Sequence, residues 1–186
     1  AKVETDVEHT LSSMRVDDSH QSNVSNDVTS SLEVLTAPLP ETASTIFGPA
    51  VDLGSQSGFI PAMYQRRFPG LTWYPTDLPS YPIENKWNDG TPGCVGVGFT
   101  KKVLSLFADY YAARNEPEMG QPFKEMAADD RVRVVDVLEP EWKHVADLEG
   151  KCQVVTCSNI LQMKALESPQ MWRQIMLGAS RLLKVG

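Results

Sequence analysis

From residue 46 onward, short apolar runs alternate with segments in which apolar residues recur at helical spacing. Residues 50–53 form an apolar run that predicts a buried strand. Apolar residues at helical spacing predict a helix over 59–68, where Pro61 fits only the first turn. Residues 71–74 are β-prone and predict a second strand that reaches Asp77. Strand, turn, helix and strand within about thirty residues have the size of a βαβ unit.

A long insert is predicted at residues 78–130. It opens with proline, asparagine and glycine residues that favour turns. A helix with an apolar stripe is predicted at 101–114, and Thr100 is its expected cap. The glycine-rich stretch 93–98 follows no clear strand, so we expect a flexible part of the insert rather than a phosphate-binding loop.

Two further strands and a final helix are predicted after the insert. The strands are expected at 131–137 and 153–157. The helix is expected to begin after Ser168, with Pro169 in its first turn, and to have Gly186 as its C-cap. Its predicted apolar stripe consists of Trp172, Ile175, Met176, Ala179, Leu182 and Leu183.

This alternation of strands and helices predicts an α/β fold. We expect a Rossmann-like parallel sheet of about four strands, with the long insert between the second and third. The fourth strand would be an edge with unpaired backbone groups. Two interpretations follow: the sequence is part of a longer chain, or a protein partner lies along the fourth strand or the last helix.

The charge is uneven along the 186 residues, whose net charge is −7. Residues 1–45 carry eight acidic and two basic residues and are predicted to be an acidic extended arm, in which 30–35 can form a short helix. Residues 46–186 are nearly neutral and are predicted to be the α/β domain. This charge does not indicate a nucleic-acid-binding surface, and no apolar stretch is long enough for a membrane span.

The cysteine and histidine residues bear on compartment and metal binding. Cys94, Cys152 and Cys157 are an odd number and contain no C-x-x-C pair, which predicts reduced thiols rather than a disulfide scaffold or a zinc site. The three histidines are scattered, so no metal site is predicted. We therefore expect an intracellular protein, and the sequence does not distinguish the cytosol from a mitochondrion or plastid.

The residues after the first predicted strand have the composition of a ligand-binding loop. Asp52, Gly54, Ser55 and Gly58 lie in a run of small residues before a helix, where backbone N–H groups can approach a ligand. Asp77 follows Gly58 by 19 residues, at the end of the second strand, where a carboxylate suits a ribose diol. The same glycines would equally serve a tight turn.

Other polar residues are predicted at the same edge of the sheet. Asp136 ends the third strand, and Ser158 and Asn159 follow the fourth. Because the carboxyl ends of parallel strands line the ligand crevice of open α/β sheets, these residues are candidates for the same site. Each has an alternative role in a turn.

At this level of detail the sequence resembles the class I S-adenosylmethionine-dependent methyltransferases, and more narrowly the group typified by methyltransferase-like protein 26. Residues 67–78, RFPGLTWYPTDL, are similar to that group's F-P-x-L-x-W-x-P-S-D segment. The group's segments after the third and fourth strands are similar to residues 136–142 and 157–160, and its following helix is similar to 177–184.

The resemblance implies S-adenosylmethionine as the cofactor of a methyltransferase-like domain at 46–186. It implies that the loop between Gly54 and Gly58 holds the methionyl end, that Asp77 binds the ribose and that Asp136 lies on the adenine side. Residues near Asn159 would face the transferred methyl group.

The sequence also departs from that family. Gln56 stands where the family's loop usually has a glycine, and a fifth strand is missing from the sequence. A non-catalytic member that serves as a structural or interaction subunit of a larger assembly is therefore our first hypothesis. An active methyltransferase of unknown acceptor is the alternative. A dinucleotide-binding oxidoreductase is a third, although the G-x-G-x-x-G spacing is absent.

Overall fold

The computed structural model describes residues 46–87, 89–128, 130–157, 160 and 168–185. The predicted acidic arm at 1–45 lies outside the described residues, and so do Ser158, Asn159 and Gly186.

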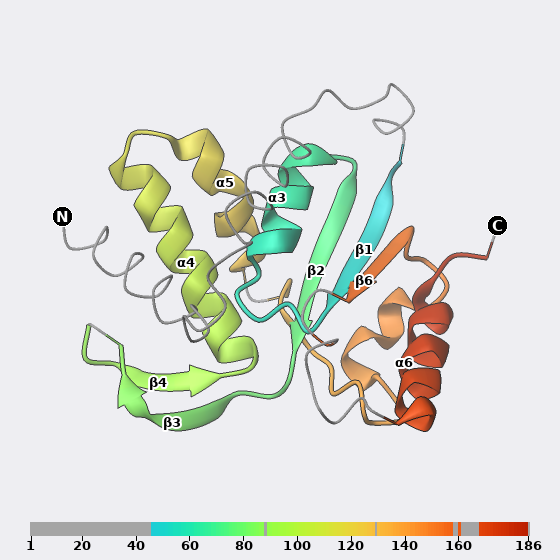
Figure 1. Ribbon diagram of the computed structural model, residues 1–186. Helices are drawn as coiled ribbons and strands as arrows, with labels where there is room; N and C mark the ends of the chain where they lie inside the picture. Colours follow the sequence, from blue (N-terminus) through green and yellow to red (C-terminus); the bar gives the residue numbers. More distant parts are fainter. Residues whose placement is uncertain (1–45, 88, 129, 158–159, 161–167, 186) are drawn as a thin grey trace, which may run out of the picture.

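A four-stranded parallel sheet forms the centre of the fold (Figure 1), in the order β5-β2-β1-β6. Its members are β1 (Gly48–Leu53), β2 (Leu71–Asp77), β5 (Arg133–Val134) and β6 (Val154–Cys157). β1 pairs in parallel with both β2 and β6, and β2 pairs in parallel with β5. The predicted α/β class with a Rossmann-like parallel sheet of four strands is confirmed.

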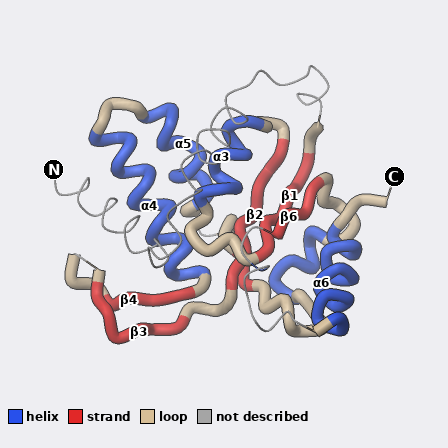
Figure 2. The backbone as a smooth tube through the Cα atoms, viewed as in Figure 1, coloured by secondary structure: helices blue, strands red, loops and turns tan. Residues whose placement is uncertain are grey.

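Helices cover both faces of this sheet (Figures 1 and 2). α3 (Phe59–Arg67), α4 (Val97–Ala113) and α5 (Pro117–Met126) lie on one side, and the 3₁₀ helix η2 (Lys143–Leu148) and α6 (Pro169–Leu182) lie on the other. Successive residues of a strand point to opposite faces, so Ala50 joins the buried cluster under α3–α5 and Val51 joins the one under α6. Burial on both faces explains the unbroken apolar run of β1.

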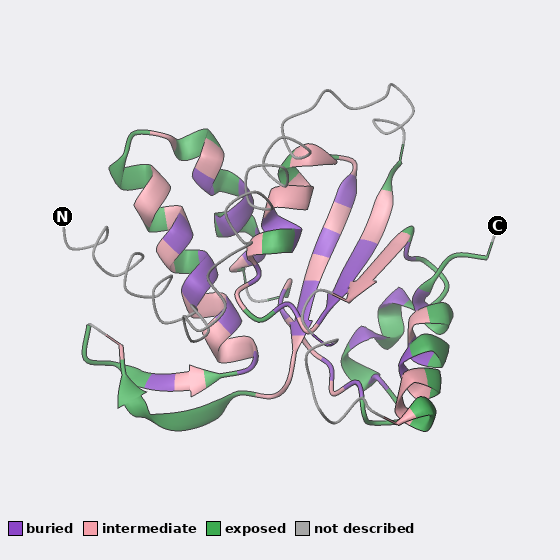
Figure 3. Cartoon of the chain, viewed as in Figure 1, coloured by how far each residue is buried: buried purple, intermediate pink, exposed green. Residues whose placement is uncertain are grey.

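The insert between β2 and β5 contains a hairpin before α4 and α5. β3 (Tyr81–Lys86) and β4 (Pro92–Val95) pair antiparallel and stand apart from the main sheet, and every residue of β3 is exposed (Figure 3). The glycine-rich stretch 93–98, expected to be flexible, instead forms most of β4 and the start of α4. Gly96 supplies the turn with φ +70°, so α4 starts at Val97 and Thr100 lies inside the helix rather than capping it as predicted.

The third strand is shorter than the predicted 131–137. Only Arg133 and Val134 form β5, because β2 beside them ends at Asp77. The N–H of Val135 still donates to the Asp77 carbonyl at 2.8 Å, and the chain then turns away from the sheet.

The last helix begins after Ser168 as predicted, but the assignment of Gly186 as its C-cap was wrong. The helix ends at Leu182, and Leu183 takes an extended conformation that forms a parallel bridge with Cys152. The N–H of Lys184 donates to the Cys152 carbonyl at 2.8 Å. Leu183 is therefore the C-cap, three residues before the predicted position, at the point where the chain pairs with the segment just before β6.

The predicted apolar stripe of α6 is correct only in part. Ile175 and Leu182 are buried, but Met176 is 62% exposed. Gly178 takes the buried position instead, because the indole ring of Trp142 lies directly against it.

Candidate functional site

The carboxyl ends of the strands meet at one edge of the sheet, and the loop between β1 and α3 lies there. β1 ends at Leu53, and the loop leads to Gly58 at the start of α3. The end of β2 lies beside this loop, since the N–H of Ser55 donates to the Thr76 carbonyl at 2.8 Å. The structure thus brings the loop and the end of the second strand together, as the sequence predicted.

Asp52 is fully buried at this edge and is held by hydroxyl groups. The hydroxyl of Ser55 donates to Asp52 Oδ2 at 2.6 Å, and that of Thr156 in β6 donates to Oδ1 at 2.6 Å. The hydroxyl of Thr76 in β2 donates to the Asp52 backbone carbonyl at 3.0 Å. One acidic residue therefore ties together three neighbouring strands and the loop, which is a structural role for Asp52 and Ser55.

The two glycines of the loop are both required by packing. Gly54 and Gly58 have φ values of +67° and +68°, which side-chain-bearing residues adopt rarely. A Cβ atom on Gly54 would lie 2.6 Å from Cγ1 of Ile160, and one on Gly58 would lie 3.0 Å from the side chain of Leu104. The tight-turn role accounts for both residues without a ligand.

Gln56 occupies the most exposed position of the loop, with a left-handed backbone. Its φ is +54°, and its side chain lies at the surface. Its backbone carbonyl accepts a 2.6 Å hydrogen bond from the hydroxyl of Thr100, and its N–H donates to the carboxylate of Asp77. Both polar backbone groups of this strained residue are thus held by other parts of the protein.

Asp77 lies half-buried beside Gln56. Its Oδ1 accepts a 2.8 Å hydrogen bond from the N–H of Leu78, and its Oδ2 lies 3.4 Å from the Thr100 hydroxyl. Burial raises the pKa of Asp77 above its ordinary value, and the nearby charge of Asp52 acts in the same direction. The hydrogen bonds from Leu78, Gln56 and Thr100 partly offset this rise in pKa.

Asp136 follows β5 in the turn that leaves the sheet. Its Oδ1 accepts a 3.0 Å hydrogen bond from the N–H of Leu138, so its carboxylate shapes the turn in the way that the alternative interpretation predicted. Asn159, the last predicted cofactor-binding residue, lies outside the described residues.

Thr100 is a residue of this site that the sequence prediction missed, as are Thr76 and Thr156, which bind Asp52. The Thr100 side chain is fully buried and contacts both Gln56 and Asp77. The sequence signalled only a helix start at this position, and nothing in the spacing linked it to a loop 44 residues earlier.

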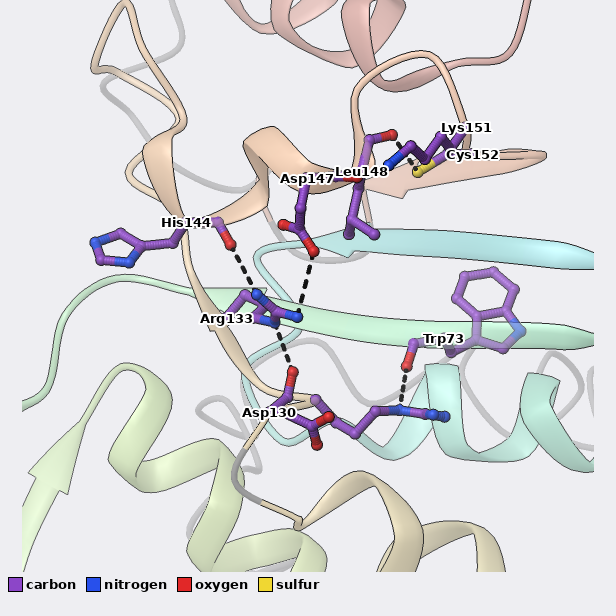
Figure 4. A network of polar contacts seen from close by, with 9 residues as sticks. Trp73, Asp130, Arg133, His144, Asp147, Leu148, Lys151 and Cys152 are labelled. Carbon is purple, nitrogen blue, oxygen red and sulfur yellow. Dashed lines mark hydrogen bonds and ion pairs between the residues drawn. The ribbon is translucent and has the colours of Figure 1, made fainter.

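A second polar cluster lies along β5 (Figure 4). The guanidinium of Arg133 donates to the backbone carbonyls of Asp130 and His144, and its Nη2 lies 3.6 Å from the carboxylate of Asp147 in η2. The open cavity beside it has a volume of about 490 Å³ and is also lined by Lys143. Since two acidic residues balance its two basic ones, this cluster ties η2 to the sheet and is no anion site.

No known family model, no curated protein and no solved structure matches this chain. Within the described residues, no group of three or more His, Cys, Asp or Glu side chains is arranged to bind a metal ion. The helices of the described part include none with the length and apolar character that crossing a membrane requires. The observations therefore define a fold class, an α/β protein with a Rossmann-like parallel sheet.

Proposed function

We propose that this chain is a methyltransferase-like domain that serves as a non-catalytic structural or interaction subunit of a larger assembly. One observation carries the proposal: Asp52, a residue expected to bind S-adenosylmethionine, is fully buried and both of its carboxylate oxygens are held by hydroxyl groups of the protein. Ser55 and Thr156 hold Asp52. The N–H of Leu78 bonds to Asp77, and that of Leu138 bonds to Asp136.

The end of the sheet at β6 supports an interaction role. β6 pairs with β1 on one side and is the last strand in the sheet order. Among the described residues, the outer side of β6 is paired only just before the strand begins, through the bridge between Cys152 and Leu183. A partner protein along β6 or α6 would cover these backbone groups and the exposed side chains of α6.

The proposed location is inside the cell. Cys94, Cys152 and Cys157 are all free thiols, which supports a reducing compartment. Burial raises the pKa of Cys152 to about 11, so this thiol stays protonated and unreactive at neutral pH.

An active methyltransferase of unknown acceptor is the alternative, and the position of Asp77 favours it. A carboxylate offers about four acceptor sites, so hydrogen bonds within the protein leave room for a ribose diol. The N–H groups at the start of α3 would face the methionyl carboxylate. The chain therefore contains the groups that both the ribose diol and the methionyl carboxylate would need.

A thermal-shift titration of the whole chain with S-adenosylhomocysteine separates the two functions. The proposal predicts no change in melting temperature for wild type up to millimolar ligand. The alternative predicts a saturable rise that is lost in Asp77→Asn. A nicotinamide dinucleotide titration tests the oxidoreductase interpretation in the same format.

A further inference from the structure

The segment 168–185, which contains α6, has a charge opposite to that of the protein. Residues 168–185 contain three basic residues, Arg173, Arg181 and Lys184, and no acidic residue, although the chain as a whole has a net charge of −7. All three basic side chains are exposed. The basic charge of this segment is therefore available to a partner.

These side chains border a groove. An open cavity of about 460 Å³ runs along α6 and is lined by Arg173, Leu177 and Arg181, with Pro140 on the opposite wall. The two arginines are eight residues apart, or about 12 Å along the helix axis. Arg181 donates to the Pro140 carbonyl at 2.9 Å, which fixes that wall to the helix.

The groove has an apolar centre. Leu177, which lines the groove, is 57% exposed, and Met176, which precedes it on α6 and lies outside the groove lining, is 62% exposed. Glu139 and Glu141 flank Pro140 but neither lines the groove, and Glu141 lies 3.9 Å from Lys143. An exposed apolar side chain beside cations, in a groove whose described lining contains no acidic residue, is typical of a protein-binding surface.

We propose that α6 docks an acidic, amphipathic segment of a partner protein. An apolar side chain of that segment packs on Leu177, and its carboxylates pair with the guanidinium groups of Arg173 and Arg181. Arginine suits this role because its planar group binds a carboxylate through two hydrogen bonds. The inference rests on the proposed interaction role and specifies the partner's chemistry.

The observations favour a protein segment over two other anionic partners. Nucleic acid would be expected to meet a denser basic surface than the three cations of residues 168–185 in an acidic chain. A membrane-surface helix needs a broad apolar face, whereas Met176 and Leu177 are the large apolar side chains that α6 exposes most, and Ile175 and Leu182 are buried.

Fluorescence anisotropy with a labelled probe tests the proposal on the whole chain. The probe is an 18-residue peptide of glutamate and leucine, with leucines at every third and fourth position. Arg173→Glu should weaken its binding about tenfold, because it removes one attraction and adds a repulsion. The matched control is Lys124→Glu, an equal charge change at an exposed position of α5 on the other side of the sheet. It should change binding less than about twofold.

Leu177→Ser provides a second variant, and its binding loss should persist at high salt. The unfolding midpoint of each variant shows that a loss of binding is not a loss of fold. The proposal is overturned if wild type does not bind the peptide, or if Arg173→Glu and Lys124→Glu bind equally well. Tighter binding of single-stranded DNA or of phosphatidylserine vesicles would also overturn it. These readouts do not involve S-adenosylmethionine, so their failure is distinguishable from failure of the proposed non-catalytic role.

Discussion

The hydroxyl of Thr100 donates a 2.6 Å hydrogen bond to the backbone carbonyl of Gln56, although the two residues lie 44 positions apart. Thr100 belongs to the first turns of α4, and Gln56 is the left-handed residue of the loop after β1. The insert is therefore part of the candidate site, since one of its buried side chains stabilises the conformation of the loop.

Replacing Thr100 by valine tests this link. Thr100→Val keeps the shape of the side chain but leaves the Gln56 carbonyl without its donor, so the free energy of unfolding should fall by about 1–3 kcal/mol. Urea unfolding measures the change. Thr91→Val is the control, because the Thr91 hydroxyl bonds to Asp89 at an exposed turn and its loss should cost less than about 0.5 kcal/mol. If the free energy of unfolding falls equally in both variants, the contact between α4 and the loop contributes little stability.

Gln56→Gly should make the protein more stable. A residue with a side chain costs about 1–3 kcal/mol in the left-handed region, and the greater freedom of glycine in the unfolded chain offsets part of the gain. We expect a net increase of about 1 kcal/mol in the free energy of unfolding. Asn115→Gly is the matched control, since Asn115 has a φ of +58° but asparagine tolerates it better. A loss of stability in Gln56→Gly would mean that the glutamine side chain itself stabilises the loop.

The pKa of Asp77 predicts a pH dependence. Burial raises this pKa in the folded protein, so the folded state binds the proton more tightly than the unfolded chain. The resulting stability is present at low pH and is lost as pH rises through the folded pKa. Between about pH 3 and pH 7, wild type should therefore lose stability relative to Asp77→Asn.

Asp89→Asn provides a control in which the stability difference from wild type should change with pH in the opposite direction. A hydrogen bond from Lys102 lowers the pKa of Asp89, so its contribution is lost as pH falls. Urea unfolding of the three proteins from about pH 7 down to about pH 2 measures both trends, because the contribution of Asp89 is lost only below its ordinary pKa. A pH-independent difference between wild type and Asp77→Asn would contradict the burial of Asp77.

Gly178→Ala sets two known effects against each other. Alanine in a helix normally adds about 1 kcal/mol of stability over glycine. Here the new Cβ would lie 2.4 Å from two ring atoms of Trp142, which is buried, and overpacking costs about 1–3 kcal/mol. We expect thermal unfolding to report a net loss, whereas Ser180→Ala on the exposed side of α6 should stay within about 0.5 kcal/mol of wild type.

Much of the fold was predictable because local signals agree with the packing. β1 is buried on both faces, so its sequence is an unbroken apolar run. Ser168 and Pro169 are residues typical of a helix start, and α6 begins there. β5 was overestimated because its alternating valines continue past the point where β2 offers a partner. The end of α6 was missed because the bridge between Leu183 and Cys152 is a long-range contact.

The candidate site was predictable only where it depends on spacing along the chain. The nearness of Asp77 to the loop follows from the βαβ order, and the strained backbone of Gln56 follows from its place in a glycine-type loop. The bond from Thr100 crosses the whole hairpin insert and has no sequence signal. The internal partners of Asp52 also escaped prediction, because Thr156 reaches it from a strand 104 residues away.

Calorimetric titration of S-adenosylhomocysteine into wild type and Gln56→Gly tests the central claim most directly. A non-catalytic subunit whose carboxylates are engaged within the protein should give no saturable heat with wild type. It should also give none with Gln56→Gly if the internal hydrogen bonds rather than the glutamine side chain close the site. Saturable binding to wild type that disappears in Asp77→Asn would contradict the account and establish this edge of the sheet as a cofactor site.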